Sequence, residues 1–467
     1  MSKAAVYESI EDDRERLIKL ARTIWDNPEL SLEEYESAAR LQEALGTAGF
    51  EIETGVAGME TAFVARYGDG DPVIGTLGEF DALPDLSQRR SADREPIEEG
   101  APGHGCGHNL FGVASLGGAI AIKRAIERGE ISGTVVYYGT PAEEIGVGKP
   151  FMVEAGAFED VDAIISWHPG WYNSASKGSC LAVDSLVFEF TGEASHAGAA
   201  PEAGRSALDA VQLMNMGVEF MREHVPDDAR IHYAIENAGA APNVVDPEAS
   251  VWYYVRAPER STVKELSAWV REIADGAATM TQTEVDVDFR GGNYNVLSNN
   301  TLADVIEDTM FELDGFEFTG DAELAADLRD SLGDVSSQVD RLPEAHATEA
   351  ADAAMYTDAV ETHDDGVVGS YSTDTGSVSW NVPVGRFRAA TWPVGTPAHS
   401  WQAVAASGSV GLDAAVFAAK VIAGSMYELF TDEATLEAAI EEFEAERATM
   451  EYEVPLPEDA DPYEMNA

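Results

Sequence analysis

A thiol and an imidazole stand two positions apart in a glycine-rich segment, Gly103-His104-Gly105-Cys106-Gly107-His108-Asn109. Cysteine thiolates and histidine imidazoles are strong ligands for zinc-like metals. The glycines allow a tight backbone turn that would bring the side chains of Cys106 and His108 to one point. The spacing therefore indicates part of a metal site, and the remaining ligands must come from elsewhere in the chain.

Further candidate ligands follow segments that we expect to be β-strands. In open α/β sheets, binding sites form just outside the carboxyl ends of the strands. Three β-rich runs, at residues 73–77, 134–138 and 163–167, end shortly before acidic or imidazole side chains, and another imidazole lies far along the chain. These side chains are Glu79, Asp81, Glu143, Glu144, His168 and His399. We expect them to converge on the loop that carries Cys106 and His108.

Each of these features also has a structural interpretation when it is taken alone. A cysteine and a histidine two positions apart can be incidental, and a pair of glutamates in an acidic chain is usually a solvated face. A histidine at a strand end can bond to the backbone, and one in a loop can be an ordinary surface residue. The chain has only nine histidines, however, and an acidic surface does not explain where they fall. Their joint placement favours a metal site with acid–base carboxylates.

The elements that must position these side chains alternate between helices and strands. Residues 7–24 have apolar positions at helical spacing and predict one amphipathic helix. Ser31 and Glu34 match a capping box that would open a second helix, with Gly49 as its stop. Residues 110–128 predict a helix directly after the cysteine segment. Their alternation with short β-rich runs predicts an α/β fold.

A different pattern begins near residue 186 and predicts a second domain. Its strands and helices occur in the order β-α-β-β-α-β, which is the ferredoxin-like unit. We expect strands at residues 186–190, 230–236, 251–255 and 285–289 and helices at 207–224 and 263–277. The predicted inserted domain covers 186–298, and the catalytic domain is split into 1–185 and 299–467. No element is predicted for the acidic, alanine-rich residues 318–350.

The chain carries an extreme negative charge. Its 85 acidic residues against 29 Lys and Arg give a formal net charge of -56, and lysine is scarce. Such a surface repels nucleic acid and anionic lipid. Self-repulsion would destabilise the fold in dilute buffer, whereas salt screens it over a Debye length of about 3 Å at 1 M. We interpret the charge as adaptation to a salt-rich cytoplasm; the alternative is an ordinary acidic protein with a solvated surface.

The remaining composition indicates a cytoplasmic protein. Two cysteines, Cys106 and Cys180, cannot form a disulfide framework. The first residues, from Met1 to Arg14, lack the pattern of a signal peptide. The best candidate for a membrane span, 110–122, is shorter than the roughly 20 residues that a span requires. We therefore expect a reduced environment and no membrane association.

Motifs along nearly the whole chain resemble those of a known enzyme family. Besides the Cys106 segment they are Asn27-Pro28-Glu29-Leu30-Ser31, Asp81-Ala82-Leu83-Pro84, Thr140-Pro141-Ala142-Glu143-Glu144, Ser195-His196-Ala197-Gly198, Pro242-Asn243-Val244-Val245, Ser372-Thr373-Asp374 and Gly395-Thr396-Pro397-Ala398-His399-Ser400-Trp401-Gln402. The chain resembles the M20 peptidases, metal-dependent amidohydrolases and carboxypeptidases, in their aminoacylase-like branch. Asn109 stands where aminoacylase-like relatives usually have Asp, and in this it is similar to the B-type aminobenzoyl-glutamate hydrolase branch. The resemblance implies a mixed-sheet, di-metal aminopeptidase-like catalytic domain and an inserted ferredoxin-like lid that carries the dimer contact.

The resemblance also implies a role for each matching residue. Two divalent ions, zinc or manganese, would be held by five ligands: Cys106, His108, Glu144, His168 and His399. Glu143 matches the general base, and Asp81 matches a residue that supports the ligands. Many relatives have a histidine ligand two positions before Asp81; here that place holds Glu79, and the cysteine-containing branch also lacks that histidine. His196, on the lid, matches a residue that reaches from the partner subunit to stabilise the oxyanion.

Substrate recognition is expected on the lid. In relatives, an asparagine and an arginine at the positions of Asn243 and Arg256 hold the substrate's free carboxylate, and the bidentate fork of arginine suits this task. The alternative for Arg256 is an ion pair with one of the many acids nearby. His232, on the neighbouring strand, could line the same pocket.

Together these features predict a cytoplasmic, metal-dependent hydrolase of N-acyl or N-aroyl amino acids, with aminobenzoyl-glutamate as the preferred substrate. A general N-acyl-amino-acid deacylase or dipeptidase of the same chemistry is one alternative, and a catalytically silent metal-binding subunit is another. We expect a homodimer through the lid domain, or a pairing with a related subunit. No nucleic-acid or membrane partner is expected.

Overall fold

The computed structural model describes residues 3–465, which form two units. Unit 1 comprises residues 3–178, 297–367 and 378–453, and unit 2 comprises residues 179–296, 368–377 and 454–465. The sequence prediction placed the last two of these segments in the catalytic domain. They group with unit 2 because β14 (Val368–Gly369) pairs in parallel with β7 (Ser179–Cys180), and Pro455 packs beside Gly292. The predicted domain ends at 1–2 and 466–467 lie outside the described residues.

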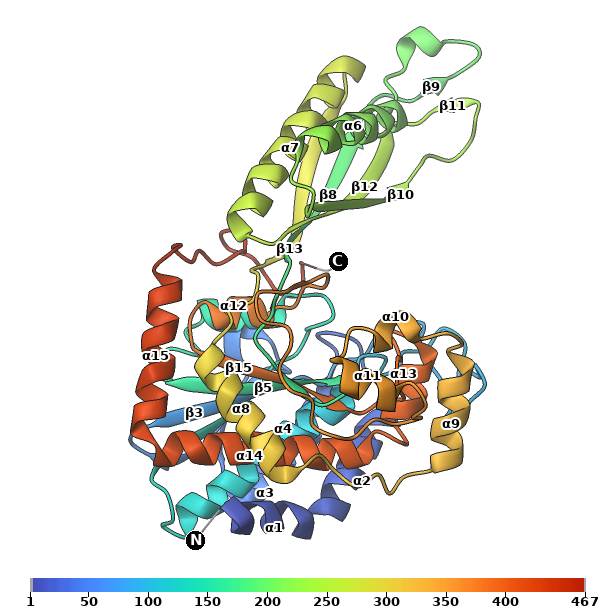
Figure 1. Ribbon diagram of the computed structural model, residues 1–467. Helices are drawn as coiled ribbons and strands as arrows, with labels where there is room; N and C mark the ends of the chain where they lie inside the picture. Colours follow the sequence, from blue (N-terminus) through green and yellow to red (C-terminus); the bar gives the residue numbers. More distant parts are fainter. Residues whose placement is uncertain (1–2, 466–467) are drawn as a thin grey trace. The chain divides into compact units, whose positions relative to one another are not determined.

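A seven-stranded mixed sheet forms the centre of unit 1 (Figure 1). Its order is β1 (Glu51–Thr54), β2 (Phe63–Asp69), β4 (Gly133–Gly139), β3 (Val73–Gly78), β5 (Ala163–Gly170), β15 (Val384–Ala390) and β6 (Ser174–Ser176). The pairs β4/β3, β3/β5 and β5/β15 are parallel, whereas the outer pairs are antiparallel. The predicted mixed α/β sheet is confirmed, and four neighbouring parallel strands, β4, β3, β5 and β15, point their carboxyl ends to the same edge.

Two long helices form the buried layer against this sheet. The helix predicted at 110–128 is α4 (His108–Glu127), and it packs along α14 (Leu412–Thr431). Nearly every side chain of both helices is buried, which is expected of a helix that is apolar on all sides. The sequence analysis named 110–122 as the best candidate for a membrane span and overlooked α14, which by length and composition alone could cross a bilayer. In the structure 72% of its most apolar window is buried, and core helices meet the same criterion.

The N-terminal helices depart from the sequence prediction at two places. The single helix predicted at 7–24 is two helices, α1 (Lys3–Asp12) and α2 (Arg14–Trp25), and the chain turns at Asp13, whose carboxylate accepts a hydrogen bond from Arg124. The capping box is also wrong. α3 (Tyr35–Ala48) has no side-chain cap; Ser31 and Glu34 bond instead to segments distant in the sequence. Gly49 ends α3 in the left-handed conformation, as predicted.

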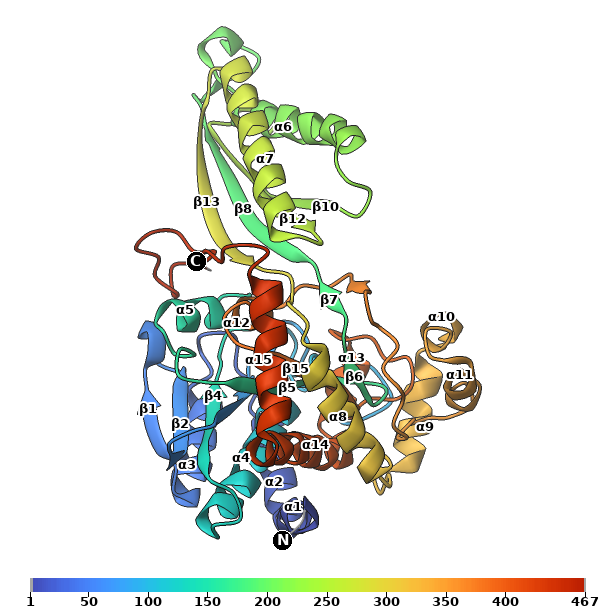
Figure 2. The same ribbon diagram turned by 60° about the vertical axis from the view of Figure 1, so that its left-hand side comes forward.

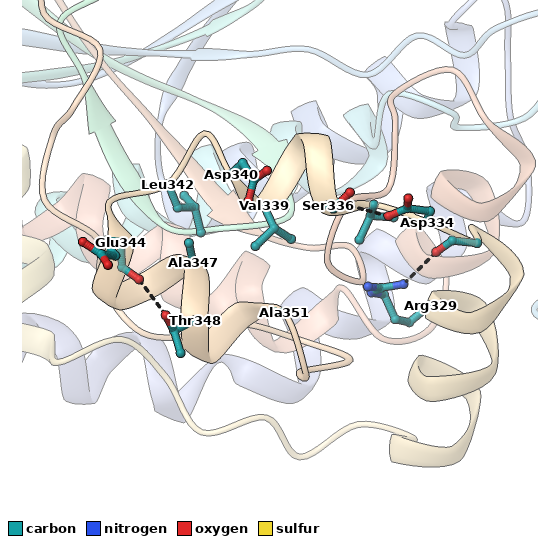
Figure 3. Close-up of a pocket in the computed structure, with 12 residues that line it drawn as sticks. Arg329, Asp334, Ser336, Val339, Asp340, Leu342, Glu344, Ala347, Thr348 and Ala351 are labelled. Carbon is teal, nitrogen blue, oxygen red and sulfur yellow. Dashed lines mark hydrogen bonds between the residues drawn. The ribbon is translucent and has the colours of Figure 1, made fainter.

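The unpredicted segment 318–350 contains three helices, α9 (Ala322–Ser331), α10 (Ser336–Val339) and α11 (Glu344–Ala350). Their apolar side chains pack against the chain before α13 (Trp401–Ser407): Leu328 lies in one cluster with Trp392, and Val335 lies in another with Val394. A pocket of about 660 Å³ opens among these three helices (Figure 3). None of the residues that line the pocket belongs to the predicted metal site. The remaining helices of unit 1 include α5 (Gly148–Glu154), α8 (Asn300–Leu313) and α15 (Glu433–Arg447).

Unit 2 has the predicted ferredoxin-like order. Its sheet runs β10 (Arg230–Asn237), β12 (Glu248–Ala257), β8 (Ala182–Thr191) and β13 (Glu284–Asn293), all antiparallel. The helices α6 (Ala207–Met221) and α7 (Arg260–Thr281) pack on one face of this sheet around a single apolar core (Figure 2). A small ribbon of β9 (Ser195–His196) and β11 (Val244–Val245) extends from the unit. The strand β10 is an edge of the sheet.

Candidate metal centre

The predicted ligands of unit 1 converge at the carboxyl edge of its sheet. Glu79 and Asp81 follow β3, Glu143 and Glu144 follow β4, and His168 lies near the end of β5. Cys106 and His108 stand at the start of α4, and His399 precedes α13. The order β4-β3-β5 makes these strand ends neighbours. The structure therefore brings together all five predicted ligands, the predicted base and Asp81.

Cys106, His108 and His168 form one cluster of potential ligand atoms. Cys106 Sγ lies 3.3 Å from His168 Nε2, and one donor atom from each of the three residues falls within 4.8 Å of the others. Gly107, between Cys106 and His108, has φ 77°, and an added Cβ there would lie 2.9 Å from Pro169. Only glycine suits this turn. The glycine signal in the sequence thus reflects a real backbone requirement.

A second cluster joins Cys106, Glu144 and His399. Their ligand atoms also lie within 4.8 Å of one another, and His399 Nε2 is 3.3 Å from Glu144 Oε2. His399 has a φ of 60° and donates its backbone N–H to Gly105 O, so the distant loop is tied directly to the cysteine segment. Half of the His399 side chain is exposed, whereas Cys106 is buried and the Glu144 side chain is only 5% exposed. The site therefore has one accessible side.

Asp81 supports the cluster by fixing two of its members. Its Oδ1 lies 2.7 Å from His108 Nδ1, and its Oδ2 accepts hydrogen bonds from the Glu144 backbone N–H and from Ser31 Oγ. A carboxylate bonded to Nδ1 leaves Nε2 of the imidazole for a metal. Burial would raise the pKa of Asp81, but the charge and hydrogen bond of His108 outweigh burial and lower it.

Two further residues lie in the site: Glu79, which the sequence placed at this edge without a defined role, and Lys149, which the sequence analysis did not identify. Glu79 and Lys149 are both buried, and Lys149 Nζ lies 2.7 Å from Glu79 Oε1. Glu79 Oε2 is 3.2 Å from His108 Nε2, and Glu143 Oε2 is 4.0 Å from the same atom. The one sign in the sequence that Glu79 belongs to the site was its position, where many relatives have a histidine ligand. Lys149, on α5, lies close after the glutamate pair but matches no motif.

The electrostatics of the site favour bound cations. Burial, with the Glu79 carboxylate next, raises the pKa of Glu143 to about 7. Burial, with the Glu144 carboxylate next, also raises the pKa of the Cys106 thiol. Burial lowers the pKa of His168 to about 3, so its imidazole is a neutral donor. Anionic groups crowded in a buried place are stabilised by positive charge.

The donor set fits divalent transition metals. His108 Nε2 and Glu144 Oε1 are buried and make no hydrogen bond within residues 3–465, as ligand atoms do when their partner is a metal. Thiolate, imidazole and carboxylate together match the ligands that zinc and related ions take in proteins. The described residues can therefore hold a metal at this edge of the sheet.

The other predicted residues lie in unit 2. His196 on β9 is exposed and pairs in register with Val244, and Ala197 N donates to Asn243 O, so His196 and Asn243 belong to one ribbon. Arg256 lies on β12 and stacks over the Tyr254 ring at 5.1 Å. His232 on β10 is exposed and pairs in register with Tyr254.

Arg256 is not used to neutralise a nearby acid. No acidic partner of Arg256 is found in the part of the chain that the structure describes, and its Nε is buried without a hydrogen-bond partner. Other arginines of the same unit do have such partners: Arg290 pairs with Glu236, and Arg260 with Asp184. Among residues 3–465, Arg256 therefore does not form the ion pair that was the alternative to a substrate-binding role.

The chain is similar to known hydrolases along nearly its full length. Residues 183–307 match the family described as the peptidase dimerisation domain of M20. The chain is 38% identical over 471 residues to one subunit of the p-aminobenzoyl-glutamate hydrolase of Escherichia coli (strain K12), covering 98% of each protein. It is 32% identical to the Xaa-Arg dipeptidase of Mus musculus, covering 68% of this chain and 72% of that protein. A dinuclear metal-binding M20 peptidase of Bacillus subtilis shares the fold, with TM-score 0.58 at 18% identity, over 90% of this chain and 99% of that one.

Proposed function

The chain belongs to the M20 family of metal-dependent hydrolases, and we propose that it hydrolyses the amide bond of an N-acyl or N-aroyl amino acid. The substrate proposed is aminobenzoyl-glutamate, which would be cleaved to aminobenzoate and glutamate. One observation carries the proposal: thiol, imidazole and carboxylate groups from separate segments converge at one edge of the sheet. The similarity to one subunit of an aminobenzoyl-glutamate hydrolase extends over nearly the whole chain, and it supports the choice of substrate.

The proposed metal ligands for two divalent ions, zinc or manganese, are Cys106, His108, Glu144, His168 and His399. When bound, such ions supply Lewis-acid stabilisation of a developing oxyanion and lower the pKa of water toward about 7. A thiolate favours zinc, whereas mixed imidazole and carboxylate ligands also suit manganese. Asp81 holds His108 in the orientation that leaves Nε2 free.

Glu143 is the proposed general base. It adjoins Glu144 at the end of β4, and its Oε2 lies 4.0 Å from His108 Nε2. A carboxylate in this place takes a proton from the attacking water and returns it to the leaving amine. Positioned general acid–base catalysis of this kind contributes about 10²–10⁴-fold.

The lid residues are proposed to bind the substrate's other groups. His196 would donate a hydrogen bond to the oxyanion, from the partner subunit, and Asn243 and Arg256 would hold the free carboxylate. The unpaired guanidinium of Arg256 supports this role, because a bidentate fork recognises a carboxylate. His232 would line the same pocket.

We propose a homodimer through unit 2. The strand β10 is an unpaired edge, and its Tyr233 and Ile235 are exposed apolar side chains. Pairing with a related chain is the alternative, because one relative bears the name of a subunit. Light scattering of the Ile235→Lys variant tests the surface: a monomer is expected, and an unchanged dimer would place the contact elsewhere.

We also propose that the protein works in a salt-rich cytoplasm. A net charge of -56 generates self-repulsion that molar KCl would screen. The ordinary acidic surface is the alternative, and it requires no salt. Melting temperature measured against KCl separates the two.

Glu143→Gln tests the catalytic proposal. The variant keeps the side chain's size but cannot accept the proton, so turnover should fall by about 10²–10⁴-fold while bound metal is retained. Glu154→Gln, an exposed position on the nearby α5, is the control and should behave as the wild type. Metal content is measured by elemental analysis after desalting. Near wild-type turnover in Glu143→Gln would refute the base assignment.

A substrate panel in high KCl tests the specificity. Glutamate, aspartate and apolar amides of aminobenzoate are compared with acetylated amino acids and dipeptides. Preference for the aroyl-glutamate supports the proposal, whereas preference for acetylated or dipeptide substrates supports the general deacylase. Bound metal without turnover of any substrate would favour the silent subunit.

A further inference from the structure

The segment 29–34 contacts the two loops that carry the acidic side chains of the site. On the β3 side, Leu30 forms a bridge with Ala82, and the Ala82 backbone N–H donates to Glu29 O at 2.8 Å. Ser31 Oγ donates to Asp81 Oδ2 at 2.8 Å. The segment therefore reaches both the backbone and the carboxylate of the Asp81 loop.

Glu34 makes the contact on the β4 side. Its carboxylate is fully buried and accepts two hydrogen bonds, from the Ala142 backbone N–H to Oε1 and from Thr61 Oγ1 to Oε2, each of 2.9 Å. A buried carboxylate is costly unless it is well bonded, so its presence here needs a specific reason.

The residue that Glu34 holds has a strained backbone. Ala142 has a φ of 59°, the left-handed region that costs roughly 1–2 kcal/mol for a residue with a Cβ. Ala142 directly precedes Glu143, so its conformation sets the direction in which the next side chains leave the turn. Such strained conformations persist where surrounding contacts hold them.

The two loops are also joined to each other. The Glu144 backbone N–H donates to Asp81 Oδ2 at 2.9 Å, which is the same oxygen that accepts from Ser31. Segment 29–34, the Asp81 loop and the Ala142 turn thus form a closed ring of contacts around the acidic groups. Each of the three is hydrogen-bonded to the other two.

We propose that Glu34 is a positioning residue that holds the strained turn at Ala142 and thereby sets the position of Glu143 against the metal cluster. The catalytic part of this inference rests on the proposed function. Glu34 itself touches neither the predicted ligands nor the base through a hydrogen bond; it acts through the backbone. A misplacement of about 1 Å at a reacting group can lower the rate by about 100-fold.

Three substitutions of Glu34 separate positioning from a merely structural role. Glu34→Ala removes both accepted bonds, and kcat should fall by between about 10-fold and 100-fold with KM and metal content unchanged. Glu34→Gln keeps an oxygen for the Ala142 N–H and should recover most of kcat. Glu34→Asp, one methylene shorter, should give an intermediate loss and serves if Glu34→Ala does not fold.

Asp413→Ala is the matched control. Asp413, on α14, is likewise a buried carboxylate that accepts a backbone N–H and a threonine hydroxyl, both from Thr319, and it also pairs with Arg14. Removal of the Asp413 carboxylate should lower the melting temperature but change kcat by less than about threefold. That change is far below the loss of about 10-fold to 100-fold expected for Glu34→Ala.

Hydrogen exchange of residues 140–146 provides a measurement that does not depend on turnover. Exchange there should rise in Glu34→Ala and remain near wild type in Asp413→Ala. Unchanged exchange in Glu34→Ala, loss of metal, or an equal kcat loss in Asp413→Ala would overturn the inference. If the wild type turns over no substrate, the proposed function fails, and the exchange comparison alone decides whether Glu34 holds the turn.

Discussion

Replacing Lys149 by methionine should strongly destabilise the protein, because it removes the ammonium group that lies against the buried Glu79 carboxylate. Lys149 and Glu79 are both buried, and Nζ lies 2.7 Å from Oε1. At that distance and an effective dielectric constant of about 20, Coulomb's law gives an attraction of about 6 kcal/mol. Desolvation offsets part of this, and removal of one partner from a buried pair typically costs about 3–5 kcal/mol. Methionine is unbranched like lysine and only one atom shorter, so little of the loss comes from packing.

The measurement is denaturant unfolding in the presence of a chelator and constant KCl, so that bound metal does not compensate for the positive charge that Glu79 loses. Lys149→Met should lower the free energy of unfolding by about 3–5 kcal/mol. The double variant with Glu79→Leu should recover at least half of that loss, since neither charge of the pair remains. Lys177→Met is the control: Lys177 pairs with the mostly exposed Asp304, and such a pair contributes about 0–1 kcal/mol.

Two results would refute this reasoning. A loss below about 1 kcal/mol in Lys149→Met would mean that the pair behaves like a surface pair. Equal losses in the single and double variants would mean that the loss does not come from the charge of Glu79.

Other predictions concern the metal, the substrate and salt. Chelation should abolish turnover and lower the melting temperature, and added zinc or manganese should restore both; full activity in metal-free protein would contradict the metal site. Cys106→Ser should weaken metal binding in an equilibrium titration, because a hydroxyl does not ionise as a thiol does; unchanged affinity would remove Cys106 from the ligands. Arg256→Lys should weaken binding of carboxylate-bearing substrates by about 1.5–3 kcal/mol, read from KM, and spare amides that lack the carboxylate; equal effects on both would exclude the carboxylate contact. The melting temperature should rise with KCl into the molar range, and a flat profile would leave the ordinary acidic surface.

Much of the fold could be read from the sequence because local patterns encode it. Apolar β-rich runs that end at polar side chains predicted β3, β4 and β5, and glycines around Cys106 predicted the turn at Gly107. The order of elements in unit 2 followed from periodicity alone. The turn at Asp13 was not predicted: its carboxylate accepts a hydrogen bond from Arg124, a residue far along the chain, and a local pattern does not reveal such a partner.

The capping-box error shows why part of the site was hidden. Ser31 and Glu34 have the types and spacing of a local cap, and the alternative partners of these side chains, Asp81, Thr61 and Ala142, are remote in sequence. Local pattern cannot distinguish a cap from a long-range contact when the same polar atoms serve both. The placement of Lys149 beside Glu79 was invisible for the same reason.

The sequence by itself determined which groups could bind metal and which strand ends would present them, since thiol, imidazole and carboxylate chemistry and the period of a strand are local properties. Only the tertiary structure decided that β4, β3 and β5 lie side by side, that His399 reaches Glu144 from the far end of the chain, and that Glu34 holds the turn before Glu143. Which polar atoms pair in these contacts depends on how the whole sheet around them packs, and the local sequence does not encode that packing.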